Sequence, residues 1–399
     1  MGITRAEFLG LAAAAGGGLL LPATGAAASA TAAGAAAGTE AATGAGAAAA
    51  ATGAGASVGA ADSKANAARR GLALRGVVYE VGEGWSRRRV RHDMRAIRHD
   101  LHASSVKVTG SGVEELTATA TEAVERGLHV WLEPTLGDRP PAEILDHLAE
   151  TGRSAERLRR QGAAVHLSVG CEFMLFVPGI VPGDTVLERI ENLLNGTFDP
   201  DRMVRELRRF TARAAAVGRS VFHGRLTYAA AEDEDVDWDL FDIVGLDYYG
   251  YFRRHADYVR DIRRHVRPGK PLAIMEFGCC TFRGAPEQGG MAWNVVDYTK
   301  EPPEIKGDLV RSERTQADYL ASVLAAFESL NLYSALAFTF VTPEAEHRRE
   351  PRYDLDMASY GIVKPIRDRP GDPTSDWHWT AKEAFHTLAA AYKKAAAKK

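Results

Sequence analysis

From Leu72 onward, short apolar, β-branched segments alternate with charged segments of helical period, and this alternation restricts the possible folds more than any other feature. Eight segments are predicted as strands, and a predicted helix, or a helix with an insert, follows most of them. The strands are expected at 75–82, 104–110, 129–134, 164–173, 220–230, 242–251, 270–278 and 334–343. Strands that alternate with helices favour a parallel sheet covered by helices.

Two architectures fit this alternation, an open doubly wound sheet and a closed barrel. The open sheet normally carries a glycine-rich nucleotide loop after its first strand, and the sequence VGEGWS at 81–86 does not match that motif. We therefore predict a single (β/α)8 TIM barrel over residues 71–399, with long βα loops after strand four (174–196) and strand seven (281–310). Loops that enclose a pocket favour exo action, and an open cleft favours endo action.

The N-terminal region is predicted to lie outside this barrel. Residues 1–30 resemble an export signal of the twin-arginine-like or general secretory kind, with Arg5, an apolar stretch at 8–22 and a small-residue cleavage site. Residues 31–70 are almost all Ala, Gly, Thr and Ser, so they are expected to form a disordered linker. We expect a secreted or cell-surface protein with no stable membrane span after signal cleavage.

Charge and cysteine content exclude some functions. A formal net charge of −3 argues against a general nucleic-acid-binding protein. The three cysteines, Cys171, Cys279 and Cys280, make neither a disulfide framework nor a Cys-x-x-Cys metal site. A pair between Cys171 and either of the other two is left open. No cofactor is expected.

Polar side chains follow nearly every predicted strand, at the end where (β/α)8 enzymes carry their active sites. One acid at a strand end means little, but a ring of ionisable residues indicates an active site. The predicted members are Glu80, Lys107, Glu133, Glu172, Arg225, Asp247, Tyr248, Tyr249, Glu276 and Thr339.

Glu172 and Glu276 are the two members of this ring that best fit a catalytic pair. They follow strands four and seven, so they are expected to face each other across the barrel mouth. Paired carboxylates suit glycosidic bond cleavage, in which one acid protonates the leaving oxygen and the other attacks or polarises the anomeric carbon. Two close acids also push their pKa values apart, which provides one protonated and one ionised group.

The strand pattern, the two glutamates, the segment KPLAIMEFG and the tyrosines after strand six resemble clan A glycoside hydrolases over about 74–388. The resemblance implies a carbohydrate substrate and a retaining mechanism. It implies Glu172 as the acid/base and Glu276 as the nucleophile. It also implies that Tyr248 or Tyr249 donates a hydrogen bond to the nucleophile.

Two positions depart from the clan's pattern. Cys171 precedes the acid/base where many members have Asn, and the eighth strand segment, FTFVTP at 338–343, lacks the usual Trp. Both departures indicate an unusual sugar or a divergent family. Trp85 and Trp293 are alternative candidates for stacking on a sugar ring.

Other interpretations stay open. Glu133, Glu172 and Asp247 could hold a divalent cation in a lyase or isomerase acting on a sugar acid, with Lys107 as the base. A non-catalytic carbohydrate-binding barrel is a further alternative. Lys107 and Arg225 are expected either to bind the substrate or to pair with Glu133 or Asp247. Within the glycosidase prediction, Glu80 and Glu133 are substrate-binding candidates and no metal is expected.

Overall fold

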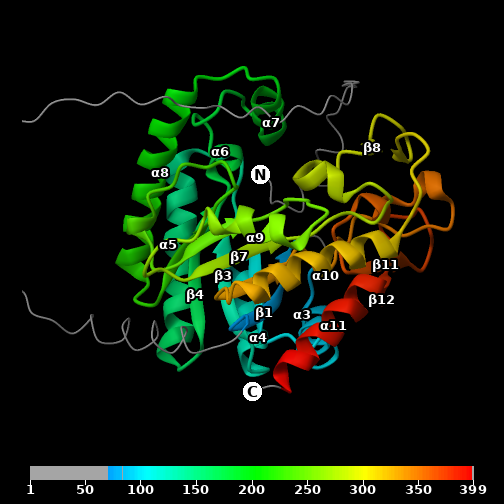
Figure 1. Cartoon of the computed structure of the whole chain (residues 1–399), viewed down its shortest axis with the longest axis horizontal. Coiled ribbons are helices and arrows are strands. Elements are labelled where there is room, and N and C mark those ends of the chain that lie inside the picture. The colour runs from blue at the N-terminus through cyan, green and yellow to red at the C-terminus, as the bar shows by residue number, and fades with distance from the viewer. Residues whose placement is uncertain (1–70, 83, 398–399) are drawn as a thin grey trace, which may run out of the picture.

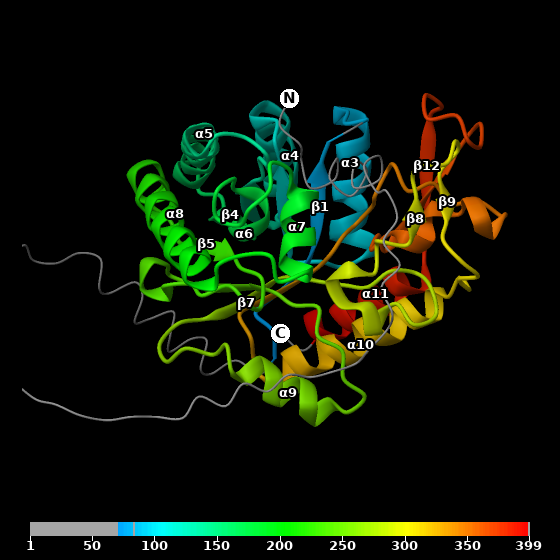
Figure 2. The same cartoon turned by 90° about the horizontal axis from the view of Figure 1, so that it is seen from above.

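A computed structural model describes residues 71–82 and 84–397 and contains a sheet of eight parallel strands curled into a barrel (Figure 1). The strand order is β5-β4-β3-β2-β1-β10-β7-β6, and the bridge between Ala230 and Leu246 joins the two edge strands. Helices surround the sheet (Figure 2). The predicted (β/α)8 barrel is confirmed, whereas the predicted export signal (1–30) and linker (31–70) lie outside the described residues.

Each barrel strand overlaps one predicted segment, although the fifth, sixth and eighth strands are much shorter than predicted. Their bounds are β1 (Leu74–Val81), β2 (Ser105–Gly110), β3 (His129–Pro134), β4 (Val165–Cys171), β5 (Leu226–Ala229), β6 (Val244–Asp247), β7 (Leu272–Phe277) and β10 (Ser334–Ala337). The fifth strand differs most, because the residues up to Val221 continue the preceding helix instead of starting a strand.

The helices follow their strands in the expected order. The α-helices are α3 (Arg87–Arg95), α4 (Val113–Glu125), α5 (Pro141–Arg160), α6 (Phe173–Phe176), α7 (Val186–Leu194), α8 (Pro200–Val221), α9 (His255–Arg263), α10 (Glu313–Ser329) and α11 (Glu383–Ala396). Shorter helical turns are η1 (Ala96–Asp100), η2 (Trp238–Leu240), η3 (Pro286–Met291), η4 (Pro351–Tyr353) and η5 (Leu355–Ala358).

Side-chain alternation along the strands creates two apolar layers. Val77 and Leu132 belong to the cluster that packs between the strands and the helices, whereas Val78 and Trp131 belong to the cluster that fills the barrel. Because successive strand residues face opposite sides, a polar residue two positions after Trp131 also faces inward. This period places Glu133 inside the barrel mouth.

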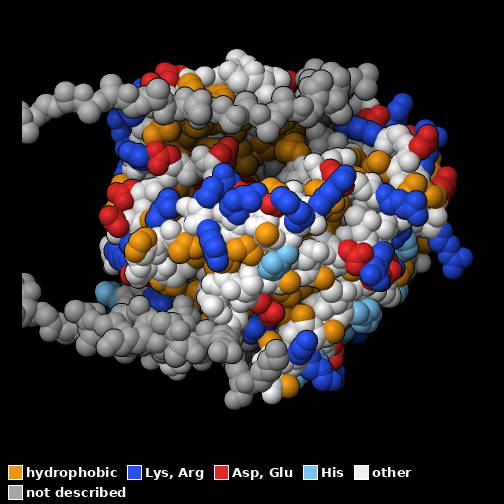
Figure 3. All heavy atoms as spheres, viewed as in Figure 1, with side chains coloured by type: hydrophobic (Ala, Val, Ile, Leu, Met, Phe, Trp, Pro, Cys, Tyr) orange, Lys and Arg blue, Asp and Glu red, His pale blue; other side chains and the backbone are white. Residues whose placement is uncertain are grey.

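Three long insertions lie at the C-terminal ends of the strands. The insert after β4 contains α6 and α7, and the insert after β7 contains η3 and the short strands β8 (Val296–Asp297) and β9 (Glu304–Ile305). The third follows β10 and includes the hairpin β11 (Val363–Arg367) and β12 (Trp377–Ala381), which the sequence analysis did not predict. Figure 3 shows this face of the molecule hollowed between the regions of α7 and β8, with hydrophobic side chains in the hollow.

The described chain contains no disulfide and no membrane-spanning helix. Cys171, Cys279 and Cys280 are all buried thiols, so the disulfide left open by the sequence is not formed. Among the described helices, none has the length and apolarity needed to cross a membrane.

Candidate active site

Glu276 lies near the C-terminal end of β7 and is fully buried. Its Oε1 is 2.8 Å from the Nζ of Lys107, and its Oε2 accepts a hydrogen bond of 2.7 Å from the hydroxyl of Tyr249. A buried carboxylate is costly unless it is paired and hydrogen-bonded. Both contacts favour the ionised form, which is the form that a nucleophile needs.

Lys107 on β2 is fully buried and links two carboxylates. Its Nζ is 2.8 Å from the Oε1 of Glu133 as well as from that of Glu276. Burial alone would lower the pKa of Lys107, but the carboxylates of Glu133, Glu276 and Asp247 outweigh burial and hold its pKa well above the usual value. Lys107 therefore carries a positive charge at the centre of the barrel mouth.

The two tyrosines after β6 have different environments. Tyr249 contacts Glu276, as the resemblance implied for one of the pair. Tyr248 points into the helix layer, where its hydroxyl donates to Asp261 of α9 at 2.9 Å and its ring contacts Phe327 of α10. The prediction of Tyr248 as a substrate-binding residue is therefore wrong, because adjacent residues of an extended chain face opposite sides.

Glu172 follows β4 directly and begins the short helix α6. Its backbone has φ 40° and ψ 57°, in the left-handed region, which costs a non-glycine residue about 1–2 kcal/mol. Its N–H donates to the carbonyl of Ala229 at 2.8 Å, and the residue is 8% exposed. Such a conformation persists only where neighbouring groups hold it, and it is a frequent feature of active sites.

A buried Tyr–Glu pair holds the turn that carries Glu172. The hydroxyl of Tyr228 accepts from the N–H of Phe173 at 2.6 Å and donates to Glu234 at 2.6 Å. Glu234 also accepts from the N–H of Met174 at 3.0 Å. Burial raises the pKa of Glu234 to about 8. The sequence analysis missed this pair, because Glu234 belongs to an acidic run, 232–235, that is typical of a solvated loop.

Cys171 lies between the two predicted catalytic acids. Its Sγ lies within 4.8 Å of a carboxylate oxygen of Glu276 and within the same distance of one of Glu172. The nearest oxygens of the two glutamates are thus at most twice this distance apart, at the same end of the barrel. Asp247, at the end of β6, accepts a hydrogen bond of 3.3 Å from the thiol of Cys171. Cys171 therefore contacts a neighbouring carboxylate at the position where many clan members have Asn.

Two further acids, Glu133 and Glu80, lie at the barrel mouth. Glu133 accepts from Lys107 and, at 3.2 Å, from the hydroxyl of Thr109. Glu80 on β1 pairs in register with Thr109, so both lie in the same layer of the barrel. Thr339, which follows β10, donates its hydroxyl to the carbonyl of Val78 at 3.0 Å. The predicted ring thus gathers most of its members at one end of the barrel.

Two predicted site residues lie elsewhere. Arg225 precedes β5 and stacks over the ring of Tyr333, which itself precedes β10, so it lies at the N-terminal end of the barrel. The prediction of Arg225 at the mouth is therefore wrong. Trp85 donates its indole N–H to Thr119 of α4 at 3.0 Å and packs against the helix layer. This contact replaces the predicted stacking of Trp85 on a sugar.

Trp293 lies in the insert after β7, 9% exposed, and packs in the same cluster as Cys171, Phe338 and Tyr360. The ring of Tyr360 contacts those of Tyr249 and Phe338, each at 5.7 Å between centroids. Trp293 therefore lies beside the mouth, and its stacking on a sugar ring stays a prediction. Tyr360 was missed, since it lies in an irregular segment whose sequence has no strand or helix period.

The predicted divalent-cation set of Glu133, Glu172 and Asp247 fits poorly. The ammonium group of Lys107 already neutralises Glu133, and its raised pKa keeps it protonated, unsuited to act as the base. Hard cations prefer oxygen ligands alone. At the mouth, both sets of side chains that lie close enough together to hold an ion include the thiol of Cys171. The donor set is better suited to direct acid–base chemistry.

The chain matches no protein-family model and no curated protein. Its structure is similar to that of the GH113 β-mannanase AaManA from Alicyclobacillus acidocaldarius, with a TM-score of 0.51 and 19% identity over 81% of this chain and 98% of that one. A GH113 β-1,4-mannanase gives a TM-score of 0.53 and 14% identity over 81% and 99% of the two chains. The chain shares its barrel fold with these enzymes. At such identities the similarity concerns the fold alone.

Proposed function

We propose that this protein is an exported glycoside hydrolase that cleaves a poly- or oligosaccharide by a two-glutamate retaining mechanism. The observation that carries the proposal is the buried carboxylate of Glu276, held between Lys107 and Tyr249 at the same mouth as Glu172. A carboxylate fixed through both oxygens at the barrel mouth suits attack on an anomeric carbon.

The proposed reaction has two steps. Glu172 protonates the leaving glycosidic oxygen while a carboxylate oxygen of Glu276 attacks the anomeric carbon, which breaks the glycosidic bond and forms a glycosyl-enzyme ester. Glu172, now ionised, takes a proton from water, and the resulting hydroxide displaces Glu276. The protonated Lys107 and the hydroxyl of Tyr249 hold Glu276 in place in both steps.

β-1,4-Mannan is the first substrate to test, because the GH113 structures that support the fold comparison are described as β-mannanases. The change to Cys171 and the lack of Trp in FTFVTP favour a panel that also includes other β-1,4-linked polysaccharides. Export is proposed from the sequence of residues 1–30.

The test compares the wild-type protein with Glu276→Gln and Glu172→Gln on this panel. Glu276→Gln removes the attacking charge with little change in volume, so turnover should fall at least about 10⁴-fold while the melting temperature changes little. Proton NMR of the first product then separates retention from inversion. Substantial turnover by Glu276→Gln, or an inverted first product, would contradict the retaining assignment.

A further inference from the structure

A cavity of about 310 Å³ opens beside the catalytic mouth, between the insert after β7 and the segment after β10. Its volume is at the lower end of the range for small-molecule sites. Trp293 and Tyr298 come from the first insert, and Tyr353 and Tyr360 from the second. This cavity, which we call the lateral pocket, involves neither Glu172 nor Glu276 in its lining.

The lateral pocket is joined to the catalytic site through one aromatic side chain. Tyr360 lines the pocket, and its ring contacts that of Tyr249 at 5.7 Å between centroids. Tyr249 in turn donates its hydroxyl to Glu276. The hydroxyl of Tyr360 donates to the carbonyl of Gly289 at 3.0 Å, which fixes the ring between the two sites. Tyr360 therefore contacts both the lateral pocket and a residue that holds Glu276.

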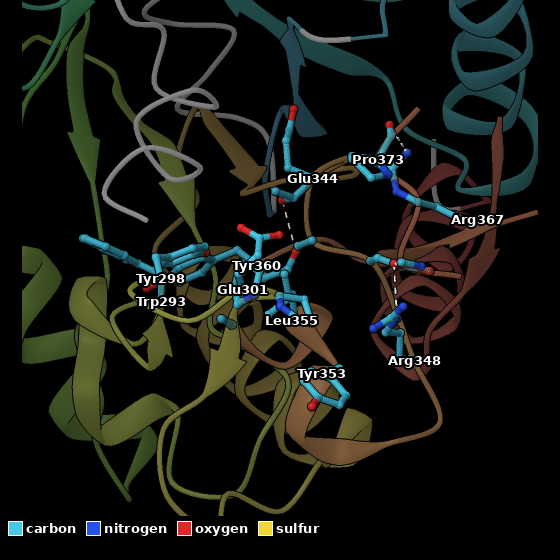
Figure 4. Close-up of a pocket in the computed structure, with 18 residues that line it drawn as sticks. Trp293, Tyr298, Glu301, Glu344, Arg348, Tyr353, Leu355, Tyr360, Arg367 and Pro373 are labelled. Carbon is cyan, nitrogen blue, oxygen red and sulfur yellow. Dashed lines mark hydrogen bonds and ion pairs between the residues drawn. The ribbon is translucent and has the colours of Figure 1, made fainter. Parts of the chain in front are cut away.

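The walls of the lateral pocket are chemically different from each other. Figure 4 shows Trp293 and Tyr298 on one side, and Arg348 and Arg367 on the other. Aromatic faces pack against the apolar face of a pyranose ring, and guanidinium groups donate to its hydroxyls. Arg367 already donates to the carbonyls of Pro373 and Ser375, so its plane is held in place.

The charges in the pocket are nearly balanced. Arg348 lies 3.4 Å from Glu346, and Glu346 also accepts from the N–H of Gly371 at 3.0 Å. Burial and then Glu344 raise the pKa of Tyr298 to about 12, which places Glu344 near that phenol and keeps the hydroxyl protonated as a donor. Two arginines and three glutamates (Glu301 included) line the pocket, so a strongly charged ligand is not favoured.

We propose that the lateral pocket is a subsite that binds an uncharged glycosyl residue of the same saccharide chain that the catalytic site cleaves. Stacking on Trp293 and Tyr298 would supply the affinity. The guanidinium and carboxylate groups would form hydrogen bonds with the sugar hydroxyls and so select for their arrangement. This inference rests on the proposed function, because it names where that substrate extends. Binding at such a remote subsite lowers the barrier of the chemical step through positioning of the scissile bond.

The first test is direct binding, by calorimetry, of the β-1,4-linked pentaoses of mannose, glucose, xylose and N-acetylglucosamine. Two proteins are compared, Glu276→Gln and Glu276→Gln combined with Tyr298→Ala. We expect the second to bind its preferred pentaose about tenfold more weakly, and both to bind the corresponding biose equally. Equal affinity for the pentaose in the two proteins, or no binding of any pentaose, would overturn the proposal.

The second test is turnover of a pentaose and of a 4-nitrophenyl monoglycoside, which has no second glycosyl residue to occupy the lateral pocket. Tyr298→Ala should lower kcat/KM on the pentaose about tenfold and change the monoglycoside reaction by less than about twofold. Tyr298→Phe should keep most activity because it keeps the ring. Tyr251→Ala, which removes an exposed ring outside the pocket lining, is the matched control and should resemble wild type.

The outcomes separate the two proposals. If the wild-type protein hydrolyses nothing but pentaose binding still depends on Tyr298, the hydrolase assignment fails and the subsite stands. If hydrolysis occurs but Tyr298→Ala affects the pentaose and the monoglycoside equally, the subsite fails and the hydrolase assignment stands. Saturation of the pocket by a free monosaccharide as tightly as by a pentaose would also overturn the chain-residue proposal.

Discussion

Glu172, the proposed acid/base, is held in place by residues buried behind it in the fold. Its left-handed backbone is followed by two N–H groups, of Phe173 and Met174, that donate to Tyr228 and Glu234. Tyr228 is fully buried and its ring stacks on Phe173 at 4.5 Å between centroids. The backbone geometry of the proposed proton donor is therefore fixed by two buried groups, the hydroxyl of Tyr228 and the carboxyl group of Glu234.

Tyr228→Phe should weaken this support. It leaves the N–H of Phe173 without its acceptor and removes one of the donors to Glu234, so stability should fall by about 1–3 kcal/mol. We also expect kcat to fall about tenfold with little change in KM, because only the positioning of Glu172 is altered. Urea unfolding and steady-state kinetics on the preferred pentaose measure the two effects.

Tyr79→Phe is the matched control for this prediction. Tyr79 is also buried and donates to a carboxylate, that of Asp93, at 2.8 Å, but it faces the helix layer. It should lose similar stability and keep its kcat. The pH profile adds a second readout, since Glu234 with a pKa of about 8 ionises near Glu172 as the pH rises. A change in rate near pH 8 that Glu234→Gln removes would support the positioning role, and identical profiles would contradict it.

At the scale of elements, an ionic cluster joins the insertions that form the lateral pocket. Arg311, just before α10, pairs with Asp354 at 2.9 Å, with Asp356 at 2.8 Å and with Glu313 at 2.9 Å. Glu313 also pairs with Lys364 of β11 at 2.5 Å. The aspartates lie on the segment after β10, so one guanidinium ties that segment to α10 and, through Glu313, to the hairpin.

Arg311→Met should therefore destabilise the protein much more than the loss of a surface pair. The side chain of Arg311 is 21% exposed, and its removal takes a counter-charge from two nearly buried aspartates, of which Asp356 keeps Lys382 at 2.8 Å. We expect a loss of about 3 kcal/mol, the lower end for a broken buried pair. Arg352→Met, which breaks the exposed pair with Glu304, is the control and should cost less than about 1 kcal/mol. Equal losses in urea unfolding would contradict this account.

The same elements show what could be predicted from the sequence. Lys107 and Glu133 were predicted at the mouth from their positions at the ends of predicted strands, and the structure shows both inside it because their side chains fall on the inward-facing period of β2 and β3. The period could not decide between Tyr248 and Tyr249, since both follow β6 and the register shifts there. Arg225 was misplaced because strand five was expected to begin at 220, whereas α8 continues to Val221. The β11–β12 hairpin has mixed composition and a Pro, so no alternation indicated it.

At the scale of the whole molecule, the two ends of the barrel differ in chemistry. The C-terminal end carries the carboxylates around Lys107. The N-terminal end is closed by rings: His129 and His166 lie 4.2 Å apart between centroids, and His166 contacts the hydroxyl of Tyr333 at 2.8 Å. Arg225 covers Tyr333 from outside. This end is closed by packed rings, and the lowered pKa values keep both the buried His166 and the partly buried His129 neutral.

Lowering the pH should destabilise the packing at the N-terminal end of the barrel before it affects the rest of the fold. Burial, and then the charge of Arg225, lower the pKa of His129 to about 4, and burial lowers that of His166 well below its usual value. Between about pH 6.5 and pH 4 the unfolded chain binds protons at these positions and the folded chain does not, so the free energy of unfolding falls as the pH falls. For His129 alone the loss is about 2 kcal/mol between pH 7 and pH 4.5.

His129→Gln tests this by removing one of the titrating groups. Urea unfolding at pH 7 and pH 4.5 should show a smaller loss for His129→Gln than for wild type, by about 2 kcal/mol. His99→Gln changes an exposed histidine and should keep the wild-type loss. An equal fall in the free energy of unfolding in all three proteins would mean that His129 has the same pKa in the folded and unfolded chains. A smaller loss confined to His129→Gln would locate acid sensitivity at the closed end of the barrel, on the far side from the proposed catalytic glutamates.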